Sequence, residues 1–65
     1  MFRNLIAELA RIGMKTPEYA RYLNVSTKTA QNKINGRTEF TLSEIKKTAG
    51  LFPGKTIDYL FAVEA

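Results

Sequence analysis

The chain has 65 residues and forms one domain, because so short a sequence buries only about 60% of its unfolded surface in a single core. It contains no cysteine, which excludes disulfides and thiolate metal sites and predicts a reducing, cytoplasmic setting. Histidine is also absent and the six carboxylates are scattered singly, so we expect no enzyme, no metal site, no cofactor and no small-molecule ligand.

The net charge of +4 is unevenly distributed along the sequence. Residues 1–40 hold seven Lys or Arg against three Glu, whereas cations and acids balance in residues 41–65. No acid occurs between Tyr19 and Thr38. An acid-free basic segment favours a polyanionic partner, although an ordinary lysine-bearing solvated surface has the same composition.

A helix is predicted over residues 2–12, because its apolar residues follow a three-and-four spacing. This stripe comprises Phe2, Leu5, Ile6, Leu9 and Ile12. Charged residues interrupt it, so it is neither a signal peptide nor a membrane span. Gly13 suits a left-handed residue after the helix, and we expect Met14 to fold back onto the helix end.

Thr16, Pro17 and Glu18 predict the start of a second helix, with a hydroxyl cap, a proline in the first turn and an acid near the positive helix end. This helix covers 17–23 and turns Tyr19, Ala20 and Leu23 inward. Residues 24–26 form the break that follows, in which Asn24 tolerates a positive φ.

Ser26 caps a third predicted helix over 27–35, which Gly36 closes. Its only apolar residues are Ala30 and Ile34, so most of its surface is exposed. The remaining side chains are hydroxyls, amides and two lysines, which suit the donor and acceptor groups of base edges. A small residue in the second helix, Ala20, allows this helix to pack close.

The next helix starts with a capping box of Thr41 and Glu44, flanked by Phe40 and Ile45 as a hydrophobic staple. We expect it to bury Leu42, Ile45, Ala49 and Phe52 and to stop before Pro53 and Gly54. A last helix over 56–61 turns Ile57, Leu60 and Phe61 inward and leaves 62–65 as a tail. The predicted fold class is all-α, a compact arrangement of five helices.

The run from Thr16 to Gly36, TPEYARYLNVSTKTAQNKING, resembles the helix-turn-helix of the lambda-repressor-like family, which includes phage repressors and Cro-type proteins. The run from Asn35 to Ile45, NGRTEFTLSEI, is similar to small regulators encoded by prophages of Gram-positive bacteria. The order of elements matches from Phe2 to Phe61. The resemblance implies one DNA-binding domain over 1–65, a helix-turn-helix at about 16–36, and a transcriptional regulator of the repressor or Cro type.

Family roles carry over to individual positions of this sequence. The resemblance implies base contacts from the residues Thr27, Lys28, Gln31 and Asn32. It implies phosphate contacts from the residues Thr16, Thr29, Asn35 and Arg37. The sequence departs from the family where Thr16 replaces a glutamine, Asn24 a glycine and Ala30 a branched residue.

Other interpretations remain open beside this one. Lys33 and Arg37 fit a purely electrostatic role at the helix C-terminus, and the three tyrosines fit the edge of the core better than stacking platforms for single strands. The same fold also serves protein-interaction modules such as antitoxins or anti-repressors. For the DNA-binding interpretation, we expect a homodimer through Phe61 and Val63 on double-stranded DNA, with the protein located in the cytoplasm and associated with the nucleoid.

Overall fold

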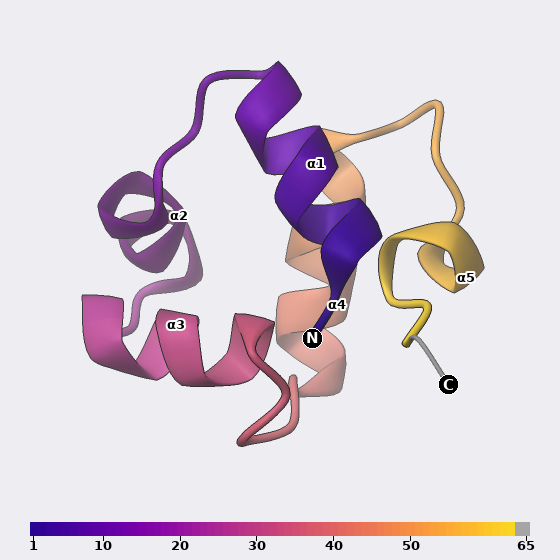
Figure 1. Cartoon of the computed structure of the whole chain (residues 1–65). Helices are drawn as coiled ribbons and strands as arrows, with labels where there is room; N and C mark the ends of the chain where they lie inside the picture. The colour runs from indigo at the N-terminus through magenta and orange to yellow at the C-terminus, as the bar shows by residue number, and fades with distance from the viewer. Residues whose placement is uncertain (64–65) are drawn as a thin grey trace.

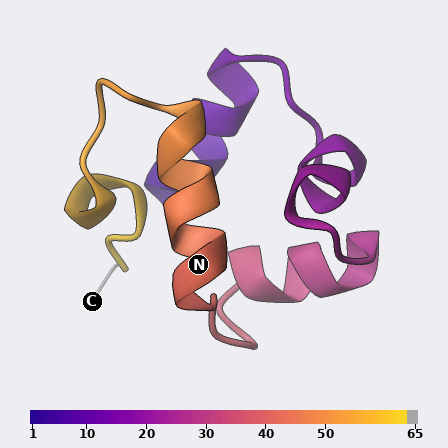
Figure 2. The ribbon, with the colours of Figure 1, turned by 180° about the vertical axis from the view of Figure 1, so that it is seen from behind.

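The structure, a computed structural model, describes residues 1–63, and within that range it contains α-helices and no strand. The helices are α1 (Arg3–Arg11), α2 (Thr16–Leu23), α3 (Thr27–Ile34), α4 (Leu42–Leu51) and α5 (Ile57–Leu60). The predicted order of five helices is therefore confirmed. Figures 1 and 2 show α4 lying behind α1 in the view of Figure 1, with α5 on one side of these two helices and α2 with α3 on the other.

Helix α1 buries a narrower stripe than its sequence predicts. Leu5 and Leu9 are in the core, but Ile6 is 38% exposed and Ile12 48%. Ile12 lies just past the helix end, where the chain turns at Gly13 with φ 71°. The expected fold-back occurs, since the Met14 N–H donates to the Leu9 carbonyl at 2.9 Å and Met14 packs against the core.

Helix α2 begins one residue earlier than predicted, because Lys15 and not Thr16 is the N-cap residue. The Thr16 hydroxyl is therefore not the cap. Instead, the Glu18 carboxylate accepts the Lys15 N–H at 3.1 Å. As predicted, the helix buries Tyr19, Ala20 and Leu23.

Helices α2 and α3 pack closely, in an arrangement consistent with a helix-turn-helix. Figure 1 shows α2 nearly end-on while α3 runs across the view, so the two axes cross steeply. Asn24 makes the turn with φ 64°, and Ala20 and Ala30 are fully buried. Because both side chains are single methyl groups, the axes of α2 and α3 can approach closely. Gly36 ends α3 with φ 83°, as predicted.

Helix α4 has the predicted capping box: Glu44 N–H donates to Thr41 Oγ1 at 3.1 Å, and Thr41 N–H donates to Glu44 Oε1 at 2.9 Å. The prediction that Leu42 is buried is wrong, because this first helical residue is 67% exposed. Glu44 and Thr48 take the buried positions, and Phe52 is buried as expected.

Helix α5 is a single turn that anchors the chain end to α1. Leu60 is fully buried, but the prediction that Ile57 turns inward is wrong, since it is 44% exposed at the start of the turn. The rings of Phe2, Phe40 and Phe61 pack edge to face, with centroids 5.0 to 5.7 Å apart. Of the predicted tail, 62–63 are exposed and 64–65 lie outside the described residues.

Among residues 1–63, no helix has the length and apolar character needed to cross a membrane.

Candidate nucleic-acid interface

The outward face of α3 carries most of the side chains that the sequence singles out for contact with DNA. At 100° per residue, positions 27, 28, 31, 32 and 35 fall within an arc of about 140°. Thr27, Lys28 and Gln31 are exposed, whereas Asn32 at the margin of this arc and Asn35 in its middle are half-buried. The opposite side of α3 buries Ala30, Lys33 and Ile34. The helix is thus fixed by its back and presents hydroxyl, amide and ammonium groups outward.

Thr29 belongs to the N-cap of α3 and lies away from this arc. Its N–H donates to Ser26 Oγ at 3.1 Å, and the Ser26 hydroxyl donates to Thr29 Oγ1 at 2.8 Å. The Thr29 oxygen is therefore occupied as an acceptor, while its own O–H can still donate to a phosphate.

Three predicted contact residues from two helices meet around one surface groove of about 370 Å³. Thr16 from α2 lines this groove together with Gln31 of α3 and Asn35, the C-cap residue of α3. The apolar part of the lining comprises Ile6, Leu9, Ala10, Met14 and Ile34. The sequence does not predict this groove, because it assigns Ile6 to the buried stripe.

Arg37 lies outside the groove, in the loop that follows α3. Its side chain is exposed, and its N–H donates to the Asn32 carbonyl at 2.9 Å. Thr38 N–H approaches the same carbonyl at 3.4 Å. These bonds hold the loop against the last turn of α3, so the backbone of Arg37 is fixed relative to Asn32.

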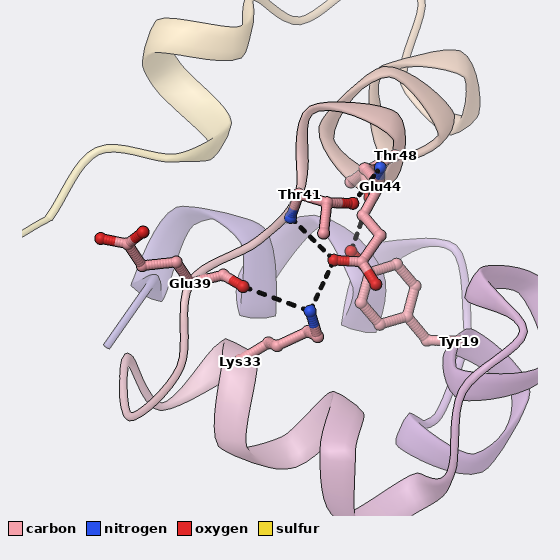
Figure 3. Close-up of polar contacts among 6 residues, drawn as sticks. All are labelled: Tyr19, Lys33, Glu39, Thr41, Glu44 and Thr48. Atoms are coloured by element: carbon pink, nitrogen blue, oxygen red, sulfur yellow. Dashed lines mark hydrogen bonds and ion pairs between the residues drawn. The ribbon is translucent and has the colours of Figure 1, made fainter.

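The interpretation of Lys33 as an exposed cation at the end of α3 is wrong, because the residue is only 8% exposed. Its Nζ donates to Glu44 Oε1 at 2.7 Å and to the Glu39 carbonyl at 3.2 Å (Figure 3). The spacing of Ala30, Lys33 and Ile34 is that of a buried helical stripe, which is the sequence signal that reveals this position.

Burial of Lys33 changes the electrostatic account of the basic segment. Residues 19–38 still contain no acid, but Glu44 neutralises one of the four cations from a neighbouring helix. The cations left exposed in this segment are Arg21, Lys28 and Arg37. Positive charge therefore remains on the outward face of α3 and on the loop after it.

The tyrosine hydroxyls are all hydrogen-bonded within the chain, which supports their assignment to the edge of the core. Tyr22 donates to the Lys47 carbonyl at 2.6 Å and Tyr59 donates to Glu8 Oε2 at 2.9 Å. Tyr19 is completely buried, with its oxygen 2.6 Å from Thr48 Oγ1. Burial raises the pKa of Tyr19 to about 12.

Comparison with protein-family models, with curated protein sequences and with solved structures finds no match to this chain.

Proposed function

We propose that the chain is a sequence-specific, non-enzymatic DNA-binding regulator that places α3 in the major groove of double-stranded DNA. The observation that carries this proposal is the outward face of α3, which is polar, partly cationic and free of acids while the back of the helix is anchored in the core. A helix held out from a small body at a fixed angle by a second helix is the geometry that major-groove recognition requires.

The proposed contacts divide into two kinds. Thr27, Lys28, Gln31 and Asn32 read base edges, because amides pair with adenine, lysine with guanine, and the threonine methyl with thymine. Thr16, Thr29, Asn35 and Arg37 hold phosphates and fix the register of the protein on the duplex. In this assignment α2 and α3 form the helix-turn-helix of a lambda-repressor-like domain, and the regulator is of the phage repressor or Cro type.

Fluorescence anisotropy on a duplex selected from a random pool tests the proposal. We expect Lys28→Ala or Asn32→Ala each to cost about 1 to 3 kcal/mol on the selected sequence and to relax specificity at one position. Lys47→Ala, an exposed lysine on α4, is the control for loss of charge. Unchanged affinity in both α3 variants would count decisively against base reading by this helix.

Salt dependence separates this function from a protein-interaction role of the same fold. If phosphates are engaged, affinity for generic duplex falls steeply between low and moderate salt, by about 0.9 logarithmic units per contact for each tenfold rise in salt. We expect Arg37→Ala to weaken binding to all sequences alike and to reduce this slope by about one unit. If the affinity for generic duplex does not change with salt concentration, the chain is better explained as a protein-interaction module.

We also propose that two copies bind together on DNA, since one such domain covers only half of a two-fold site. Three exposed apolar residues are close in sequence to the packed rings of Phe2, Phe40 and Phe61. Met1 is 52% exposed, Leu42 67% and Val63 63%. Each lies within two residues of one of these rings. A second copy of this chain would cover them.

A further inference from the structure

A chain of buried and part-buried polar contacts joins α3, the loop after it and α2 to the first two turns of α4. Lys33 of α3 donates to Glu44 Oε1 at 2.7 Å, and Glu44 in the first turn of α4 also accepts the Thr41 N–H at 2.9 Å. One turn later, the Thr48 hydroxyl donates to the Glu44 carbonyl at 2.8 Å and meets the Tyr19 hydroxyl of α2 at 2.6 Å. Figure 3 shows these side chains converging between the helices.

The loop that carries Arg37 is tied to α3 at both ends, by two neighbouring residues of that helix. Its start folds onto α3 through the bond from Arg37 N–H to the Asn32 carbonyl, and its far end is held by Lys33 Nζ, which donates to the Glu39 carbonyl at 3.2 Å. Lys33 thus contacts both α4 and the loop. The far end of the loop and the orientation of α3 therefore depend on the same ammonium group.

Burying the Lys33–Glu44 ion pair between α3 and α4 carries a large desolvation penalty. Removing two charges from water costs several kcal/mol per ion, and apolar residues of similar volume commonly give equal or greater stability. An ion pair with full hydrogen bonding differs from apolar packing in being directional. Among the described residues, no buried side-chain nitrogen or oxygen lacks a partner, so this network is satisfied throughout.

We propose that Lys33 and Glu44 are a positioning pair, which fixes the orientation of α3 and of the Arg37 loop and thereby sets the discrimination between specific and generic DNA. This inference rests on the proposed DNA-binding function and adds a role for two residues that touch no DNA. The pair acts on discrimination through Gln31 and Asn32, whose positions follow from the orientation of α3, while the backbone bond to the Asn32 carbonyl keeps Arg37 beside the last turn of the helix.

The test uses the full chain with the double substitution Lys33→Met and Glu44→Gln. Glutamine at position 44 still accepts the Thr41 N–H, so the capping box survives while both charges are removed. Glu8→Gln is the matched control, because it removes a buried charge between α1 and α5, away from α3. Affinities for the selected duplex and for a generic duplex are measured at equal salt, with melting temperatures and residual dipolar couplings of the α3 amides.

We expect the double variant to stay folded, to show altered α3 couplings relative to α4, and to lose about tenfold in the ratio of selected to generic affinity. Generic binding and its salt slope stay unchanged, and Glu8→Gln keeps the wild-type ratio. A ratio within about twofold of wild type, or unchanged couplings, would overturn the proposal. A salt slope lower by about one unit in Lys33→Met alone would instead make Lys33 a phosphate contact.

Failure of the DNA-binding function itself is distinguishable from failure of the positioning role. A wild-type chain that binds neither duplex would overturn the function and, with it, the role in discrimination. The couplings are measured without DNA, so they decide in every case whether the pair orients α3.

Discussion

At Glu44, burial and hydrogen bonding act on the carboxyl group in opposite directions. Burial by itself raises the pKa, but the hydrogen bond from Lys33, those from Thr41 and the charge of Lys33 together outweigh it and hold the pKa below the ordinary value of 4.5. The folded chain therefore binds this proton less readily than the unfolded chain does. Glu44 contributes stability only while it is ionised.

This shift predicts a loss of stability in acid. The contribution of Glu44 is complete at neutral pH and is lost as pH falls below about 4.5 and through the lowered pKa of the folded state. Thermal unfolding between neutral pH and pH about 3 measures it. Glu44→Gln is the reference, and we expect its acid-induced decrease in stability to be shallower than that of the wild type. Parallel curves would show that Glu44 is not responsible.

At alkaline pH, the raised pKa of Tyr19 predicts that stability decreases as pH rises. Burial raises its pKa from 10.0 to about 12, so the unfolded chain releases this proton first and stability falls as pH rises through this interval. The hydrogen bond to Glu8 also raises the pKa of Tyr59. Ultraviolet absorbance of tyrosinate in the folded chain should show a tyrosine that titrates near pH 12, and Tyr19→Phe should remove that step. Its persistence in Tyr19→Phe would assign the raised pKa to another tyrosine.

Backbone conformations at single residues can be predicted from the sequence, whereas contacts between distant residues cannot. Gly13, Asn24 and Gly36 have the expected positive φ, because that requirement is imposed by the chain within a few residues of each turn. The spacing of Lys33 with Ala30 and Ile34 is compatible with burial, but its partner is 11 positions away in another helix, so the sequence does not predict the ion pair. The sequence predicts the capping half of the Glu44 contacts, which are local, and misses the other half.

Between α2 and α3, the turn depends on one residue that holds a left-handed conformation. Asn24 has φ 64° and its N–H donates to the Arg21 carbonyl at 3.1 Å. We expect Asn24→Ala to lower the free energy of unfolding by about 1 kcal/mol, because a β-carbon is strained in this conformation. Asn24→Gly should change it by less than about 0.5 kcal/mol. Denaturant unfolding compares them, and equal stability of the two variants would contradict the strain argument.

The four-residue helix α5 relies on a buried carboxylate of α1. Glu8 is 2% exposed and accepts the Tyr59 hydroxyl, with Arg11 Nε at 3.5 Å and Lys55 Nζ at 4.0 Å. We expect Glu8→Gln to lower stability by about 1 kcal/mol and to speed amide exchange at Leu60 and Phe61. Tyr59→Phe removes one of these contacts and should have a smaller effect. Exchange that accelerates equally in α3 would indicate global rather than local loosening.

Helix existence and order follow from caps and periodicity, whereas the inward direction of end residues does not. Leu42 and Ile57 are each the first residue of a helix, where the side chain has no preceding turn to pack against and lies exposed. A hydroxyl before proline predicts Thr16 as the cap, yet Lys15 is the N-cap residue. Such one-residue differences arise at helix boundaries, where several residues satisfy the same local rules.

At the scale of the whole molecule, the candidate site combines one local and one non-local feature. The outward face of α3 could be predicted, because seven of the nine residues in the expected helix 27–35 are polar and only Ala30 and Ile34 suit a core. The groove between Thr16 and Gln31 could not, since it depends on how α1 packs against α2 and α3. The network around Glu44 could not be predicted either, because it joins residues from three helices.

Dimer formation is the property of the whole molecule that the exposed apolar residues predict. Half-sites of a two-fold operator lie about 34 to 36 Å apart, which exceeds the 26 Å largest extent of this chain. If the proposed function holds, each half-site takes its own copy, and we expect two copies to bind a two-half-site duplex cooperatively. Val63→Asp should abolish the cooperativity and preserve affinity for a single half-site, because it places a charge at the proposed contact between copies.

Anisotropy on one-site and two-site duplexes, with sedimentation of each complex, measures this difference. Ile12→Asp is the matched control, since Ile12 is 48% exposed at the far end of α1. Phe61→Asp is unsuitable, because its ring packs against Phe2 and Phe40 and the change would disturb the fold. If Val63→Asp and Ile12→Asp bind the two-site duplex alike, the second copy contacts another surface, and the exposed residues around the three rings do not form the interface.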